Sequence, residues 1–185
     1  ITSSKKLELI LEYRDLEHIH VTGGKISGSE ALNTDNLELT LVEGAGADLS
    51  IRAAFVGLKM EGNSSADLRI EADSMSTHLS GYTDSRIYAS GGPLSVSMTG
   101  QASLDLEGVT GSLNVSLTDN TKLKASGMEA TAVKAFLNSS ANARLYAVNN
   151  IAYEGRGSAR LFVYGQPAIQ ILGLYDSAEL HKVPD

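Results

Sequence analysis

Two aspartates are the first residues in this sequence that suggest chemistry, because they recur at the same place in two successive repeats. Asp48 and Asp67 each precede a short apolar strand. Stacked repeats would bring the two carboxyl groups near the lower limit of the ~5–9.5 Å separation used in glycoside hydrolysis. No neighbouring group is evident that would raise the pKa of one carboxyl, as an acid catalyst requires. A hard cation such as calcium takes about six or more oxygen ligands. The pair therefore favours a solvated row of charges over a catalytic or metal site.

The four histidines give no stronger signal. His18 and His20 share one face of a predicted strand and could bind a metal ion, but exposed edge histidines are the simpler interpretation. His78 and His181 fall at other repeat positions, and no Ser-His-Asp spacing stands out. Gly-rich pairs such as Gly91-Gly92 fit turns rather than a phosphate-binding loop. The sequence thus predicts no catalytic residue, no metal site and no cofactor.

Aromatic side chains are the better candidates for binding. Tyrosine and phenylalanine gather in the last three repeats, although aromatics make up only 5% of the chain. Sugar rings stack on aromatic faces, and aromatic residues are enriched at interfaces. Some of these rings could instead close the end of the core, because terminal repeats must be capped. The candidate binding residues are Tyr146, Tyr153, Phe162, Tyr164 and Tyr175.

Composition excludes several classes of partner. The net charge of −7 argues against nucleic acid, whose phosphates require clustered lysine and arginine. It also argues against electrostatic docking on an anionic membrane. There is no cysteine, so disulfides, thiolate catalysis and cysteine-type zinc sites are excluded. No stretch reaches the ~18 apolar residues of a transmembrane helix. The chain begins at Ile1 rather than at a methionine, which is compatible with removal of a leader or an upstream segment.

A repeat of about 19 residues must position any such site. Short strands with alternating apolar residues recur from Leu49-Ser50-Ile51 to Leu161-Phe162-Val163, and Leu180 opens a last one. Alternation with period two predicts strands with one buried face. Residues that tolerate left-handed backbone angles recur at a constant spacing of 19 between these strands. They are Gly62, Gly81, Gly100, Asp119, Asn138, Gly157 and Asp176, and Gly24 extends the series backwards.

A second, fainter row of turn residues divides each repeat into two strands. Its members are Asp73, Gly92, Gly111, Ala130 and Asn149. The second strand of each repeat alternates as clearly as the first, as in Leu94-Ser95-Val96-Ser97-Met98 and Leu113-Asn114-Val115-Ser116-Leu117. Like residues recur in one direction, which favours parallel stacking over hairpins. Weaker strands at 7–11, 19–21 and 37–41 extend the pattern, so that about nine coils stacked ~4.8 Å apart form a single domain over residues 1–185.

Outward positions of neighbouring coils should form columns. The spacing predicts that Asp67 lies beside Arg86, Asp105 beside Lys124, and Arg160 beside Glu179. Such exposed cross-strand pairs contribute about 0.2–1 kcal/mol each. If each coil is aligned on the first apolar residue of its strand, the column through Arg86 continues with Ser103 and Lys122.

Several segments resemble one known family. The stretch Ile19-His20-Val21-Thr22-Gly23-Gly24-Lys25-Ile26 is similar to the signature of the auto-transporter adhesin head domain, the GIN domain. Small-residue turns before strands, at 44–49, 62–68 and 155–161, look like that family's repeats, and the resemblance covers about residues 7–183. Three turns depart from the pattern because aspartate or asparagine replaces glycine, at Asp119, Asn138 and Asp176.

The resemblance implies a right-handed, single-stranded parallel β-helix of the pectin-lyase kind, in a protein exported to the cell envelope. The implied role is adhesion, without catalytic residues. A non-catalytic binding module with glycan or cell-surface protein partners is therefore the first hypothesis. A polysaccharide-active lyase or hydrolase is the second. The third is a structural spacer that forms homo-oligomers through a contact above ~1,000 Å².

Overall fold

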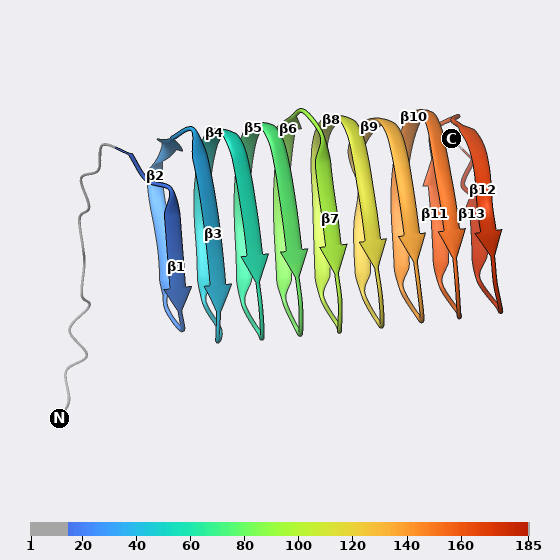
Figure 1. The fold of residues 1–185 in the computed structure, drawn as a ribbon, viewed down its shortest axis with the longest axis horizontal. Coiled ribbons are helices and arrows are strands. Elements are labelled where there is room, and N and C mark those ends of the chain that lie inside the picture. The colour runs from blue at the N-terminus through green and yellow to red at the C-terminus, as the bar shows by residue number, and fades with distance from the viewer. Residues whose placement is uncertain (1–14, 185) are drawn as a thin grey trace.

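A computed structural model describes residues 15–184, and within this range the chain is entirely β-structure (Figure 1). The strands follow one another as the rungs of a solenoid, with the N-terminal coil at one end and the C-terminal coil at the other. They are β1 (His18–Thr22), β2 (Lys25–Asn33), β3 (Asn36–Val42), β4 (Gly46–Met60), β5 (Ser65–Leu79), β6 (Asp84–Gly91), β7 (Leu94–Met98), β8 (Ser103–Leu117), β9 (Lys122–Leu137), β10 (Asn142–Gly155), β11 (Arg160–Tyr164), β12 (Ala168–Leu174) and β13 (Glu179–Lys182).

Every pairing between these strands is parallel, as the constant direction of the repeat predicts. Each coil has two arms that join at a corner. The first arms, such as Ser65–Ala72 of β5, stack on those of β4 and β6, and the second arms stack on one another separately. We call the outer surface of the first arms the first-arm face, and the outer surface of the second arms the second-arm face. The expected strand at 7–11 lies outside the described residues.

Tight turns join each coil to the next at one edge of the solenoid, seen along the lower side of Figure 1. Most of the predicted turn residues have the expected left-handed backbone, with φ of 74° at Gly62, 83° at Gly81 and 66° at Asp119. Two predictions are wrong by one position. Ser139 takes the left-handed conformation (φ 62°) in place of Asn138, whose side-chain oxygen accepts a hydrogen bond from the Ser139 N–H at 2.8 Å.

The second correction falls at the start of the solenoid. Gly23 (φ 64°), not Gly24, is the left-handed residue there. At the other corner, β4, β5, β8, β9 and β10 continue through the bend as single long strands. The chain breaks into β6 and β7 at Gly91-Gly92-Pro93, because proline has no N–H to donate to the ladder.

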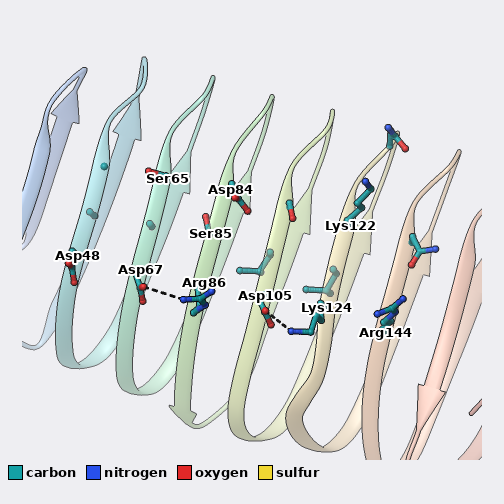
Figure 2. Close-up of a pocket in the computed structure, with 18 of the residues that line it drawn as sticks. Asp48, Ser65, Asp67, Asp84, Ser85, Arg86, Asp105, Lys122, Lys124 and Arg144 are labelled. Atoms are coloured by element: carbon teal, nitrogen blue, oxygen red, sulfur yellow. Dashed lines mark hydrogen bonds and ion pairs between the residues drawn. The ribbon is translucent and has the colours of Figure 1, made fainter.

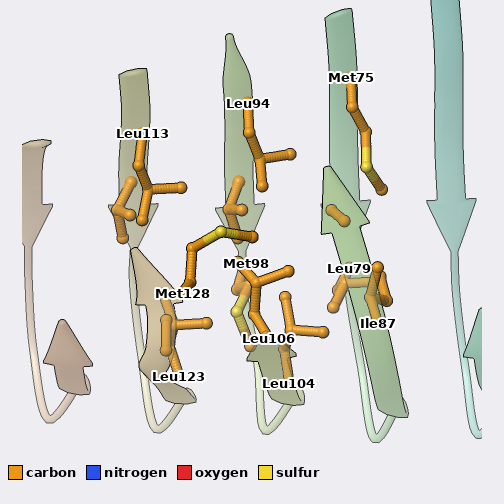
Figure 3. Packing of buried hydrophobic residues seen from close by; sticks show 14 of the residues in the cluster. Met75, Leu79, Ile87, Leu94, Met98, Leu104, Leu106, Leu113, Leu123 and Met128 are labelled. Carbon is orange, nitrogen blue, oxygen red and sulfur yellow. The ribbon is translucent and has the colours of Figure 1, made fainter. Parts of the chain in front are cut away.

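The core is a set of apolar rows that run along the solenoid axis (Figure 3). Met75, Leu94 and Leu113 lie beside one another in register, and Leu79, Met98 and Leu117 form a parallel row. These side chains are at most 6% exposed. Among the described residues, Tyr153 is the one aromatic side chain in this core. A narrow layered interior of aliphatic residues explains the low aromatic content.

One predicted column is wrong in its register after Arg86, where the chain passes from β6 to β8. Arg86 lies beside Asp105 rather than Ser103, and the coil between them has 19 residues like its neighbours. The reason is Ser85, which occupies the inward position that Leu104 fills in the next coil and is only 5% exposed. Its hydroxyl donates to the Met60 sulfur at 3.2 Å. An alignment by the first apolar residue skipped this inward serine.

Candidate binding groove

The first-arm face carries a shallow groove of about 960 Å³ that crosses seven stacked strands, β2, β4, β5, β6, β8, β9 and β10 (Figure 2). It begins at the coil of Lys25 and ends at the coil of Arg144. Its lining is mostly polar, with hydroxyl, carboxylate, amide and cationic side chains. The lining residues are Lys25, Gly46, Ala47, Asp48, Ser65, Ala66, Asp67, Asp84, Ser85, Arg86, Ser103, Leu104, Asp105, Asn120, Lys122, Leu123, Lys124, Ser140, Asn142 and Arg144.

Two outward columns build this groove, and parallel register fixes their order. Both columns face outward; we call the one nearer the tight turns the inner column and the other the outer column. The inner column carries small residues at Gly46 and Ser65, which leaves room for the groove. Its members are Gly46, Ser65, Asp84, Ser103, Lys122 and Asn142. The outer column carries the longer charged groups, which are Asp48, Asp67, Arg86, Asp105, Lys124 and Arg144.

Ion pairs between neighbouring coils occur where the sequence predicts them. Asp67 and Arg86 approach to 3.8 Å, and Lys124 donates to Asp105 at 2.7 Å. The predicted pair of Arg160 and Glu179 has a separation of 3.4 Å. Apart from Asp105, whose side chain is 28% exposed, these side chains are about half exposed or more, so each pair contributes about 1 kcal/mol or less. Their main effect is to hold the coils in register.

The stacked carboxylates of Asp48 and Asp67 lie on adjacent coils, as the sequence indicates. Each has a cation on its other side, because Lys25 approaches Asp48 to 3.9 Å and Arg86 approaches Asp67 to 3.8 Å. Both carboxyl side chains are more than 60% exposed. Residues 15–184 contain no group of three histidine or carboxylate side chains placed to hold a metal ion. The arrangement is therefore suited to pairing with external cations and hydroxyl groups rather than to burying an acid.

Charge is distributed unevenly along the groove. The N-terminal half holds three carboxylates and two cations, and the C-terminal half holds three cations and one carboxylate (Figure 2). The first group is Asp48, Asp67 and Asp84 with Lys25 and Arg86, and the second is Lys122, Lys124 and Arg144 with Asp105. This segregation was not evident from the sequence, because it depends on the register that Ser85 obscured. Small residues directly after each tight turn were the available signal for the groove itself.

Three of the predicted aromatic residues continue the first-arm face beyond Arg144. Phe162 follows Arg144 in the outer column, and its ring stacks on His181 with centroids 4.9 Å apart and planes at 14°. Tyr146 and Tyr164 lie beside each other in the adjacent outward column. All three side chains are partly exposed. We call Tyr146, Phe162 and Tyr164 the aromatic platform.

The other two predicted aromatics lie elsewhere. Tyr153 points inward and is 0% exposed, so its assignment as a binding residue is corrected to a core position near the end of the solenoid. Its hydroxyl donates to the Glu179 carbonyl at 3.3 Å, and burial raises its pKa to about 12. Tyr175 is 47% exposed at a tight turn, where the Arg156 guanidinium lies 4.6 Å from its ring centre. The structure does not bring it to the platform.

The histidines do not form a common site in the described part of the chain. His18 and His20 share the outer side of β1, and His20 contacts the Thr22 hydroxyl at 3.2 Å. His181 contacts the Glu179 carboxylate at 2.8 Å, and this hydrogen bond lowers the pKa of Glu179. His181 therefore supports the Phe162 ring from one side and is held by Glu179 on the other.

The chain was compared with known proteins and families. A family model described as "Putative auto-transporter adhesin, head GIN domain" matches residues 1–91 and 69–167. No curated protein and no solved structure matches the chain. None of the described residues forms a helix long and apolar enough to cross a membrane. The two matched segments together cover most of the sequence, and the chain accordingly belongs to the auto-transporter adhesin head GIN domain family.

Proposed function

We propose that this domain is a non-catalytic adhesion module, exported to the cell envelope, that binds a glycan chain along its first-arm face. The observation that carries the proposal is the groove of about 960 Å³, which crosses seven strands and stays open to solvent. Extended polymers need a long, shallow surface with repeated polar contacts, and the two columns supply such contacts at every coil.

The aromatic platform supports a sugar ligand in particular. The Phe162 ring is fixed by its stack on His181, and Phe162, Tyr146 and Tyr164 are all partly exposed, so the platform offers an ordered aromatic surface that a sugar ring can contact. Coils repeat about every 4.8 Å, which is close to the length of one pyranose ring. A glycan that runs along the solenoid axis would therefore meet an equivalent pair of side chains with each successive sugar.

A polysaccharide-active enzyme is the second candidate, favoured by the adjacent carboxylates of Asp48 and Asp67. Their exposure and their flanking cations argue for binding, because a general acid needs an environment that keeps its proton near neutral pH. Incubation with plant and bacterial polysaccharides, followed by assay of new reducing ends or unsaturated products, separates the two. Turnover that Asp67→Ala abolishes would replace the adhesion proposal.

A glycan array on the purified domain is the first test of binding. The strongest hit is then titrated by calorimetry against Ser65→Trp, which fills the groove, and Phe162→Ala, which removes the platform. Ser95→Trp is the matched control, because Ser95 is also an exposed strand serine but lies on the second-arm face. We expect Ser65→Trp and Phe162→Ala to lose binding and Ser95→Trp to retain it. Equal binding by all three variants, or no hit on a broad array, would refute the proposal.

A further inference from the structure

The C-terminal half of the groove holds a compact group of cations. Lys122 and Lys124 project from β9, two residues apart on the same outward side, and Arg144 projects from β10 beside Lys124. A spacing of about 4.8 Å between coils and about 3.3 Å per residue along a strand places the three Cα atoms within ~10 Å of one another. In a chain of net charge −7, this local excess of positive charge is distinctive.

Only one of these cations has an anionic partner within residues 15–184. Lys124 donates to the Asp105 carboxylate at 2.7 Å, whereas Lys122 and Arg144 form no ion pair in that range. The charges are mutually repulsive on neighbouring rungs, where like charges are destabilising. An anionic ligand would relieve this repulsion, and a guanidinium presents a planar fork that holds a carboxylate or sulfate with two parallel hydrogen bonds.

The position of Arg144 relates this cationic group to the aromatic platform. Phe162 is the next residue in the same column, so a sugar ring that contacts the exposed edge of the platform lies beside the Arg144 guanidinium. The opposite end of the groove carries three carboxylates, Asp48, Asp67 and Asp84, against two cations, Lys25 and Arg86, so its formal charge is −1 and it does not attract a continuous polyanion. A suitable ligand thus places its negative groups at the C-terminal end of the groove, either because it is acidic at one end or because neutral sugars separate its acidic groups.

From these contacts we infer that Lys122, Lys124 and Arg144 select an acidic glycan, one whose carboxylate or sulfate groups are separated by neutral sugars. The inference rests on the proposed glycan-binding function. It adds the charge of the ligand and the direction in which the ligand lies along the solenoid axis. Arg144 and Lys122 bind the acidic groups, Lys124 is shared with Asp105, and the aromatic platform contacts the adjoining sugar ring.

The test measures affinity for four probes at two salt concentrations: oligogalacturonate for carboxylates, heparin oligosaccharides for sulfates, cello-oligosaccharides as neutral sugars, and polyphosphate as a non-sugar polyanion. The variant is Lys122→Gln with Arg144→Gln. Its matched control is Lys59→Gln with Lys134→Gln, which removes equal charge from the second-arm face.

We expect at least one acidic glycan to bind more tightly than the neutral one, and to lose about tenfold or more in affinity in the groove variant. The control should change by less than about twofold, and added salt should weaken acidic binding. The acidic probe that binds better identifies carboxylate or sulfate as the recognised group.

Three outcomes would overturn the inference. If cello-oligosaccharides bind as tightly as the acidic probes and Ser65→Trp abolishes that binding, the glycan function stands but charge selection fails. If polyphosphate equals the acidic glycans, the cations form a non-specific polyanion surface. If sedimentation shows that the cations instead hold two copies of the chain together, with dimers lost in the groove variant, they serve self-association. Absence of binding to every sugar would remove the proposed function as well.

Discussion

The Asp119 carboxylate accepts a hydrogen bond from the backbone N–H of Gly100, one coil earlier, at 3.0 Å. Asp176 repeats this contact with the N–H of Gly157 at 3.1 Å. Both aspartates have left-handed backbones, with φ of 66° and 60°. Aspartate tolerates this conformation better than most residues. At these turns the side chain adds a bond between coils that glycine cannot provide.

The first prediction concerns this bond. Asp119→Ala removes the acceptor and places an alanine in the left-handed region, so we expect the free energy of unfolding to fall by about 1–3 kcal/mol. Asp119→Asn keeps a side-chain oxygen and a residue type that adopts positive φ, and should cost less than about 1 kcal/mol. Urea denaturation followed by circular dichroism measures both. Equal losses in the two variants would contradict the role assigned to the carboxylate geometry.

A second prediction compares two glycines. Gly81 has a φ of 83°, and a Cβ there would lie 2.7 Å from the Gly62 carbonyl oxygen in the turn beneath it. Gly81→Ala should therefore destabilise the fold by about 2–3 kcal/mol. At Gly111 an added Cβ meets no heavy atom within 4 Å and no positive φ is present. Gly111→Ala should be neutral or stabilising by up to about 1 kcal/mol. Thermal unfolding measures both variants. If Gly81→Ala has a higher midpoint than Gly111→Ala, the turn at Gly81 adapts to a Cβ more readily than its contacts indicate.

The third prediction uses two buried threonines. The Thr121 hydroxyl oxygen is buried without a hydrogen-bond partner among the described residues, whereas the Thr110 hydroxyl donates to the Gly92 carbonyl at 2.6 Å. Replacing an unsatisfied hydroxyl by a methyl group removes a desolvation cost, so Thr121→Val should stabilise the domain by about 1 kcal/mol. Thr110→Val leaves the carbonyl without its donor and should destabilise by about 1–2 kcal/mol. Chemical denaturation gives both values, and a loss of stability in Thr121→Val would point to a bound water at that hydroxyl.

The fourth prediction is a pH dependence. Burial raises the pKa of Tyr153 from 10.0 to about 12, so the folded state keeps the proton at pH values where the unfolded state has lost it. The stability from this difference is fully present below about pH 10 and is lost as the pH rises toward 12; a shift of about two pH units corresponds to roughly 2–3 kcal/mol.

Tyr153→Phe cannot ionise and should lose part of this alkaline decline, at the cost of the hydrogen bond to Glu179, about 1 kcal/mol at neutral pH. Unfolding free energies measured between pH 8 and 11.5 make the comparison. The matched control is Tyr82→Phe, because the Tyr82 side chain is 67% exposed. If Tyr153→Phe and the parent chain decline in parallel above pH 10, the buried phenol is not the group responsible.

The sequence was sufficient for the coil and for the charge pairs, because both depend on spacing. Left-handed turns favour glycine, aspartate or asparagine, and the regular recurrence of these residues predicted the edge where Gly62, Gly81 and Gly100 lie. Asp105 and Lys124 were predicted as neighbours for the same reason. Register was lost where a polar residue faces inward, as Ser85 does. Sequence patterns identify inward positions by hydrophobicity, so a buried serine hides the alternation.

The groove was harder to predict than the coil. A groove depends on the difference in size between side chains on adjacent columns, and so on an accurate register across seven strands. Tyr153 shows a related limit, since its position in the repeat is inward while its residue type suggested a surface role. Of the five candidate aromatic residues, the three that follow the outward alternation of the first arm, Tyr146, Phe162 and Tyr164, reach the first-arm face.

The extra residue between Asp119 and Ser139 is accommodated within β9, yet Lys122 and Asn142 still meet in register on either side of it. The offset between paired residues rises from 19 at Asp105 and Lys124 to 20 at Glu107 and Gly127, so the extra residue is taken up within the first arm, just past the two groove columns. The groove columns keep their alignment because the irregularity begins only after them. Under the proposed glycan-binding function, whole coils gained or lost during evolution would lengthen or shorten the binding surface by one rung at a time, and relatives would differ in ligand length without any change in how a single rung is built.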